Sequence, residues 1–258
     1  MKLRLLEGAM MLSVVELLEV EPDIVQVKMQ DRTHRNAFSK ELIQGLNQSF
    51  ELIRAHPRYK AVILTGYDSY FSTGGTQEGL LGIQQRAIKF TDDNLYSLAL
   101  DCPIPVIAAM QGHGIGGGFV MGLFADFVIL SRESIYTTNF MRYGFTPGMG
   151  ATYIVPQKLG FALAQELLMN AGNYRGADLE KRGIAYPVVP RNQVLPHALE
   201  LARQLAEKPR HSLMTLKEHL VAPLREQLSK TIQQELAMHD KTFHHEDVKK
   251  RISELYGS

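Results

Sequence analysis

The sequence of 258 residues holds one cysteine, Cys102, and no apolar run of the roughly 18 residues that a membrane-spanning helix needs. A single cysteine excludes an internal disulfide and is typical of a reducing compartment, so we expect a cytoplasmic protein. Cys102 precedes a proline in an apolar context and is expected to be buried and inert. Neither disulfides nor a membrane span is therefore predicted.

Net charge is also nearly absent, because 28 basic residues face 27 acidic ones and leave +1. This balance offers no electrostatic reason to expect nucleic acid or an anionic membrane as a partner. No spacing of histidine, cysteine and acidic residues predicts a metal site, since the adjacent His244 and His245 would point to different faces of a helix. Hydrophobic residues make up 45% of the chain, which is enough for a sizeable core.

Three regions follow from the pattern along the chain. Residues 1–12 are expected to be a leader or a disordered N-terminus, because their apolar part is too brief for a signal peptide. Residues 13–193 alternate strand and helix signals, among them strands over 14–20 and 24–29 and a helix from the capping residue Ser39 to about 55. Residues 194–258 are amphipathic helices punctuated by Pro209 and Pro223, and no Gly/Ser linker separates them from the rest.

A glycine-rich turn stands at the centre of the chain. Residues 104–110 predict a buried strand, the letters Q-G-H-G-I-G-G-G follow, and residues 119–127 predict a helix. Such a turn exposes backbone N–H groups that have no partner inside the helix, and glycine lets a substrate oxygen approach them. The turn lacks the Gly-Lys-Ser/Thr ending of a phosphate loop and the acidic residue of a dinucleotide site. A tight turn that merely needs positive φ is the alternative, and the triple glycine favours the functional interpretation.

A second turn of the same kind lies upstream. Residues 59–65 predict a strand, and F-S-T-G-G-T-Q follows over residues 71–77. Two such turns can aim the N–H groups of Gly75 and Gly117 at one oxygen. Donors fixed in this way stabilise a developing oxyanion, and losing one of them typically costs about 3 kcal/mol.

These motifs resemble the crotonase (enoyl-CoA hydratase/isomerase) superfamily, and the resemblance runs from about Val14 to the C-terminus. The letters that carry it are F-S-T-G-G, Q-G-H-G-I-G-G-G, A-D-F-V-I-L and G-F-T-P-G-M-G-A-T. It implies a crotonase-like α/β fold, a spiral of ββα units whose C-terminal helical region closes the active site. It also implies a homotrimer or a dimer of trimers, and a thioester whose carbonyl oxygen lies between the N–H groups of Gly75 and Gly117.

The resemblance implies no metal or redox cofactor, because the phosphopantetheine or CoA arm is part of the substrate. In the family the loop matching residues 31–38 borders that arm, so Asn36 and Ala37 are candidate substrate-binding residues. A purely loop-structuring role for Asn36 is an equally good interpretation.

The chain departs from the hydratase pattern at both catalytic glutamates. By motif register the first would stand at Val120 and the second at Phe140, and neither side chain can move a proton. Water addition is therefore not expected, and an isomerase that uses a carboxylate at the second position is in doubt. An apolar pocket lined by Val120, Phe140 and Tyr143 suits a reaction that makes an enolate without a carboxylate base, and decarboxylation is such a reaction.

Decarboxylation needs a cation for the leaving carboxylate and a proton donor. Lys89, on a helix expected from about residue 84 to 100, is the candidate cation, and His239 is the candidate donor. Taken alone, each residue is more often a surface or packing residue. However, the stretch M-H-D-K-T-F-H-H-E, together with those above, resembles the polyketide β-branching (bacillaene-type) members of the superfamily.

Those members act on an acyl chain carried by an acyl carrier protein. The resemblance implies that a 3-methylglutaconyl-type thioester loses CO2 to give a dienolate, which is protonated to a β-methyl enoyl thioester. Lys89 would seat the carboxylate, and His239 would protonate or orient the substrate. Two other hypotheses stay open: a double-bond isomerase with His239 as its base, and a non-catalytic protein that binds the carrier. Convergence of Lys89 and His239 on the two glycine turns would disfavour the binding-only hypothesis.

Overall fold

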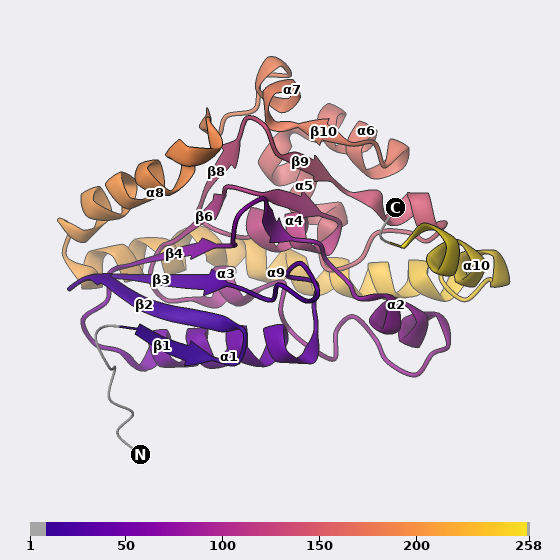
Figure 1. The fold of residues 1–258 in the computed structure, drawn as a ribbon, viewed down its shortest axis with the longest axis horizontal. Coiled ribbons are helices and arrows are strands. Elements are labelled where there is room, and N and C mark those ends of the chain that lie inside the picture. The colour runs from indigo at the N-terminus through magenta and orange to yellow at the C-terminus, as the bar shows by residue number, and fades with distance from the viewer. Residues whose placement is uncertain (1–8, 257–258) are drawn as a thin grey trace.

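The computed structural model describes residues 9–256, which form a mixed α/β fold built on two sheets (Figure 1). The larger sheet has the strand order β1-β2-β3-β4-β6-β8-β11 and the smaller one has the order β10-β9-β7-β5. Pairing in the larger sheet is antiparallel from β1 to β3 and parallel from β3 to β11. The strands of the two sheets are β1 (Ala9–Leu12), β2 (Val15–Glu21), β3 (Ile24–Met29), β4 (Ala61–Thr65), β6 (Val106–Met110), β8 (Phe127–Ser131) and β11 (Val188–Val189), and β5 (Tyr70–Ser72), β7 (His113–Ile115), β9 (Ile135–Thr137) and β10 (Tyr174–Arg175).

Helices cover both faces of the larger sheet. β4 and β6 are buried at every position, as expected of parallel strands packed on two sides. In Figure 1, α1 and α8 lie on opposite sides of this sheet, and α9 crosses the molecule. The helices are α1 (Lys40–Ala55), α2 (Gln77–Gln84), α3 (Leu98–Asp101), α4 (Gly117–Leu123), η1 (Asn139–Tyr143, a 3-10 helix), α5 (Ala151–Leu159), α6 (Phe161–Asn170), α7 (Gly176–Lys181), α8 (Arg191–Ala206), α9 (Arg210–Thr242) and α10 (Glu246–Leu255).

A repeating unit places the two glycine turns side by side. β4 of the larger sheet is followed by β5 of the smaller one and then α2, and β6, β7 and α4 repeat this order. Because β5 and β7 pair in parallel, the two turns that follow them emerge at the same edge. This arrangement confirms the predicted crotonase-like spiral of ββα units.

Local signals predicted several elements well. α1 begins directly after Ser39, whose hydroxyl accepts the N–H of Leu42 at 3.2 Å, and β3 has the predicted bounds. The expectation of a leader or disordered N-terminus is wrong for residues 9–12, because β1 pairs along β2. Residues 1–8 lie outside the described part of the chain.

Two predictions about helix length are wrong. The helix expected from about residue 84 to 100 is not formed over residues 85–97. The helix α2 ends at Gln84, and Arg86 takes a positive φ of 62° after two helix-weakening glycines. Pro223 was expected to separate two helices but lies inside the continuous α9. Val221 and Leu228 are buried on either side of Pro223, so packing offsets the hydrogen bond that proline loses.

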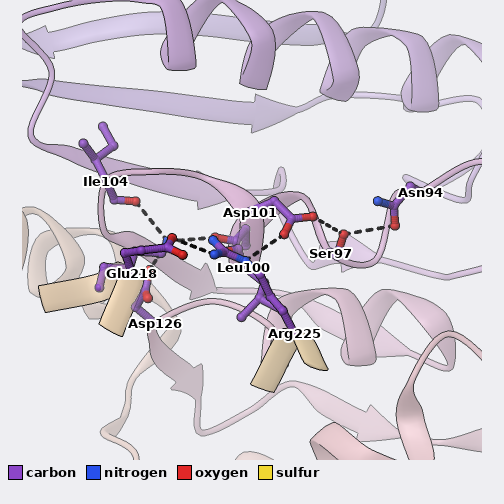
Figure 2. A network of polar contacts seen from close by, with 10 residues as sticks. Asn94, Ser97, Leu100, Asp101, Ile104, Asp126, Glu218 and Arg225 are labelled. Carbon is purple, nitrogen blue, oxygen red and sulfur yellow. Dashed lines mark hydrogen bonds and ion pairs between the residues drawn. The ribbon is translucent and has the colours of Figure 1, made fainter. Parts of the chain in front are cut away.

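A buried ion pair joins α9 to the parallel sheet. Lys217 is 5% exposed, and its Nζ donates to the Asp126 carboxylate at 2.7 Å and to the carbonyls of Ala99 and Ile104 at 2.9 and 3.1 Å. Figure 2 shows the contacts around it, in which Arg225 reaches Asp101 and Glu218. This network fixes the first half of α9, whose second half reaches the site described next. No helix within residues 9–256 combines the length and apolar character needed to cross a bilayer.

Candidate active site

The two glycine turns are in direct contact. Gly74 has φ of +76°, and a methyl group added there would lie 3.1 Å from the Gly117 nitrogen and 3.3 Å from the Gly118 nitrogen. A methyl group on Gly118 would overlap the Ser72 carbonyl oxygen. Glycine is therefore required at these positions, because any side chain would push the turns apart.

Each turn is anchored by hydrogen bonds, while the backbone N–H of Gly75 and that of Gly117 stay unpaired within the described residues. The Gly74 carbonyl accepts the N–H of Phe38 at 2.7 Å, and Gly116 donates to the Thr137 carbonyl at 2.8 Å. Within residues 9–256 neither the N–H of Gly75 nor that of Gly117 has an acceptor. Gly117 is the first residue of α4, so the partial positive charge of the helix terminus adds to its donor. Two neighbouring free donors at one sheet edge have the character of an oxyanion hole.

Apolar side chains occupy the positions where hydratases of the family would carry carboxylates. Val120 is fully buried in α4, and Phe140 is buried in η1 with its ring 6.2 Å from that of Phe145. Tyr143, also on η1, stacks on Phe145 at 6.0 Å. Burial raises the pKa of Tyr143, so its phenol stays neutral. The environment around the turns is therefore aromatic and without a general-base carboxylate at either position.

His239 lies on α9 in this aromatic cluster. Its ring centroid is 5.1 Å from that of Phe90, 5.0 Å from Phe243 and 6.2 Å from Phe145, and the side chain is 6% exposed. Its Nε2–H donates to the Thr146 carbonyl at 2.9 Å. Desolvation is the main cause that lowers the pKa of His239 from 6.5 to about 4. The imidazole is thus neutral near pH 7.

A short loop links His239 to the second glycine turn. A methyl group on Gly148 would lie 2.7 Å from His239 Cε1, and one on Gly117 would lie 2.6 Å from the Met149 sulfur. His239 and Gly117 therefore contact adjacent residues of the same loop. His239 is thus linked to the second glycine turn through Gly148 and Met149, and its role in a reaction stays a prediction.

Lys89 is placed differently from the expectation. It lies in the irregular segment 85–97 rather than on a helix, its side chain is exposed, and its backbone N–H donates to the Asp92 carboxylate at 2.8 Å. The next residue, Phe90, contacts both His239 and Gly148, where an added methyl group would lie 3.2 Å from its Cδ1. The segment thus borders the site, while the ammonium group of Lys89 faces solvent.

Asn36 and Ala37 support the first turn. The buried Asn36 amide donates to the carbonyls of Met29 and Phe71 at 3.1 and 3.0 Å and accepts the N–H of Asp31 at 2.8 Å. These contacts give Asn36 the loop-structuring role that was one of its two interpretations. Ala37 forms a β-bridge with Gly74, and its contact with a substrate stays a prediction.

Glu235 is a buried residue that the sequence did not single out. Its carboxylate accepts the N–H groups of Gly150 and Thr152 at 2.7 and 2.9 Å and the Thr152 hydroxyl at 2.6 Å. It thereby caps α5 and ties the loop at Gly148 and Met149 to α9, and burial raises its pKa. The only sequence signal is its position one helical turn before His239, which places both on the same face of α9.

The His239 pKa predicts how stability depends on pH. Because the pKa is lowered on folding, the unfolded chain binds a proton between about pH 6.5 and pH 4 that the folded protein does not, so stability falls as pH falls through this window. The variant His239→Gln keeps a donor for the Thr146 carbonyl. When the pH is lowered from 8 to 5, we expect its free energy of unfolding in urea to fall by about 2 kcal/mol less than that of the wild type. Equal losses in both proteins would contradict a buried neutral histidine. Burial raises the pKa of Glu235, so its contribution to stability increases as the pH falls. This contribution is the same in both proteins and cancels in the comparison.

Comparison with known proteins connects this geometry to catalysed reactions. The family model described as enoyl-CoA hydratase/isomerase matches residues 19–255. The chain is 75% identical over 246 residues to the bacillaene synthase decarboxylase PksI of Bacillus subtilis (strain 168), which covers 95% of this chain and 99% of that protein.

Solved structures agree with the sequence comparison. A structure described as a dehydratase/decarboxylase enzyme couple involved in polyketide β-branching matches with a TM-score of 0.95 at 75% identity, covering 95% of this chain and all (100%) of the other. The ECH2 decarboxylase domain of CurF from Lyngbya majuscula matches with a TM-score of 0.91 at 44% identity, covering 95% and 100% of the two chains.

Proposed function

The chain belongs to the enoyl-CoA hydratase/isomerase family, and we propose that it is a decarboxylase of polyketide β-branching. The observation that carries this proposal is the pair of N–H groups at Gly75 and Gly117, which have no acceptor among residues 9–256, in a site whose two general-base positions hold Val120 and Phe140. Such a site can stabilise an enolate and cannot deprotonate carbon with a carboxylate at those positions. Loss of CO2 generates the enolate without a base.

We propose as substrate a 3-methylglutaconyl-type thioester carried by an acyl carrier protein. The thioester oxygen accepts hydrogen bonds from Gly75 and Gly117. The bond to the carboxyl carbon breaks, its electron pair enters the conjugated system, and the negative charge develops on the thioester oxygen. Protonation of the dienolate then gives the β-methyl enoyl thioester. This sequence requires no metal or redox cofactor.

Lys89 and His239 have distinct roles in this proposal. Lys89 binds the leaving carboxylate. For this its ammonium group turns from solvent towards the site, while Phe90 holds the segment 85–97 in place. His239 has a pKa of about 4, so its neutral ring orients the substrate, and a carboxylate bound beside it would raise that pKa and make it a proton donor.

Assembly as a homotrimer, or a dimer of trimers, in the cytoplasm is part of the same proposal. Exposed apolar side chains on α9 support self-association, with Leu216 57% and Leu220 61% exposed. Light scattering during size-exclusion chromatography measures the assembly state.

Mass spectrometry of a 3-methylglutaconyl-loaded carrier protein tests the proposed reaction. Wild type is expected to remove the mass of one CO2, and Lys89→Ala and His239→Ala to do so about 10²-fold more slowly, as for loss of a positioned charge or proton-transfer group. Lys230→Ala and His219→Ala change exposed residues of α9 and are matched controls that should keep wild-type rates.

Two other outcomes would contradict the proposal. An unchanged mass with a shifted ultraviolet absorbance of the enoyl group would indicate a double-bond isomerase. Neither change, with the carrier protein still bound, would indicate a non-catalytic binding protein.

A further inference from the structure

The C-terminal helix α10 packs beside the first glycine turn. Figure 1 shows it next to α2, and it also contacts η1. Val248 and Ile252 are buried on its inner face. At its start the His244 ring donates to the Gln84 carbonyl at 2.9 Å, which joins α10 to the end of α2. The helix is therefore held against the two elements that flank the site.

Tyr256 caps the end of this helix and reaches the turn. Its backbone N–H donates to the Ile252 carbonyl at 3.2 Å, and its hydroxyl donates to the Gly75 carbonyl at 3.1 Å. Burial raises the pKa of Tyr256, so the phenol keeps its proton well above neutral pH. The side chain is half-buried and joins residues separated by 181 positions in sequence.

Gly75 has few other restraints. Its neighbour Gly74 is fixed by hydrogen bonds from Phe38 and to Ser72, and Thr76 caps α2 through the N–H of Gly79 at 3.0 Å. Within the described residues the N–H of Gly75 is unpaired, and its carbonyl accepts only the Tyr256 hydroxyl. Glycine without a restraint samples many conformations, whereas an oxyanion donor stabilises charge only when its direction is set beforehand.

We propose that Tyr256 is a positioning residue that orients the Gly75 N–H donor by holding the carbonyl of the same residue. It acts through the turn and does not touch the reacting atoms. This inference deepens the proposed function, since it rests on Gly75 being an oxyanion donor. It assigns a role in catalysis to the residue that follows α10.

The variant Tyr256→Phe removes the hydroxyl and keeps the ring. We expect kcat for decarboxylation to fall about 5–10-fold, the equivalent of one hydrogen bond, while KM changes less than twofold and the melting temperature stays at the control value. Tyr174→Phe is the matched control, because it removes a hydroxyl that donates to Glu166 at 2.8 Å on the remote β10. A kcat within twofold of wild type, or an equal fall in Tyr174→Phe, would overturn the positioning role.

A binding measurement separates failure of this inference from failure of the proposed function. Acetoacetyl-pantetheine offers a thioester carbonyl that pantetheine lacks, so the ratio of their dissociation constants reports the carbonyl contact without any turnover. We expect wild type to prefer the acetoacetyl form, and Tyr256→Phe to lose about 5–10-fold of that preference with pantetheine binding unchanged. A full preference retained in the variant overturns the positioning role alone. No preference in wild type overturns the oxyanion site, and both proposals with it.

Discussion

Replacing Gly75 by proline is expected to lower kcat for decarboxylation by about 10²–10³-fold, the effect of removing one oxyanion donor. Proline has no N–H, so the substitution deletes the donor at the position where the thioester oxygen gains charge. The loss should appear in kcat rather than in KM, because the negative charge is present only after CO2 begins to leave. Steady-state kinetics with the loaded carrier protein measure both constants.

Gly75→Ala is the matched control for this substitution. It retains the N–H, and its methyl group would meet only the flexible Leu80 side chain, at 3.1 Å. The alanine variant should therefore keep most of the activity, within about tenfold of wild type. Equal losses in the two variants at matched melting temperatures would show that shape, and not the N–H donor, explains the requirement for glycine.

Replacing Asp126 by alanine is expected to lower the free energy of unfolding by about 3–5 kcal/mol, because it leaves the Lys217 ammonium buried without a counter-charge. The two carbonyls that also accept from Lys217, those of Ala99 and Ile104, do not neutralise it. The backbone N–H of Val106 loses its acceptor as well, at 2.7 Å from the same carboxylate. Urea unfolding followed by circular dichroism measures this loss.

A double variant distinguishes charge burial from loss of packing. Asp126→Ala with Lys217→Met removes both charges and should be at least about 1 kcal/mol more stable than Asp126→Ala alone. Glu226→Ala breaks the exposed pair with Lys230 and should change stability by no more than about 0.5 kcal/mol. If the double variant lost as much stability as Asp126→Ala and Lys217→Met lose together as single variants, the buried-charge explanation would be contradicted.

The buried ion pair also affects the candidate active site, because Lys217 and His239 lie on the same helix, α9. Lys217 joins the first half of α9 to the sheet, and Glu235 and His239 lie further along the same helix. A helix fixed at one end by charge and at the other by the Glu235 contacts with Gly150 and Thr152 holds the His239 ring with little freedom. Asp126→Ala is therefore also expected to raise the mobility of His239.

Local chemistry was enough to predict much of the fold and the two turns. Ser39 begins α1 because a hydroxyl can cap a helix terminus, and buried strands stand out as apolar runs. Gly74 and Gly116 adopt positive φ, which glycine tolerates, so the turns were visible as strings of glycine. The absence of glutamate at positions 120 and 140, where Val120 and Phe140 stand, could also be predicted from the sequence, because it requires only the alignment of the motifs.

Contacts between distant parts of the chain decided the remainder. The sequence around Lys89 is typical of a helix, but α2 ends at Gln84 and Arg86 takes a positive φ. The segment that follows is positioned instead by the contact of Phe90 with His239. The pKa of His239 is lowered by burial among aromatic rings, two of which (Phe90 and Phe145) come from other segments of the chain. The partners of Glu235 lie in a loop about 85 positions away. Burial and hydrogen-bond geometry of this kind arise only when the chain is folded, because they require residues that no local pattern brings together.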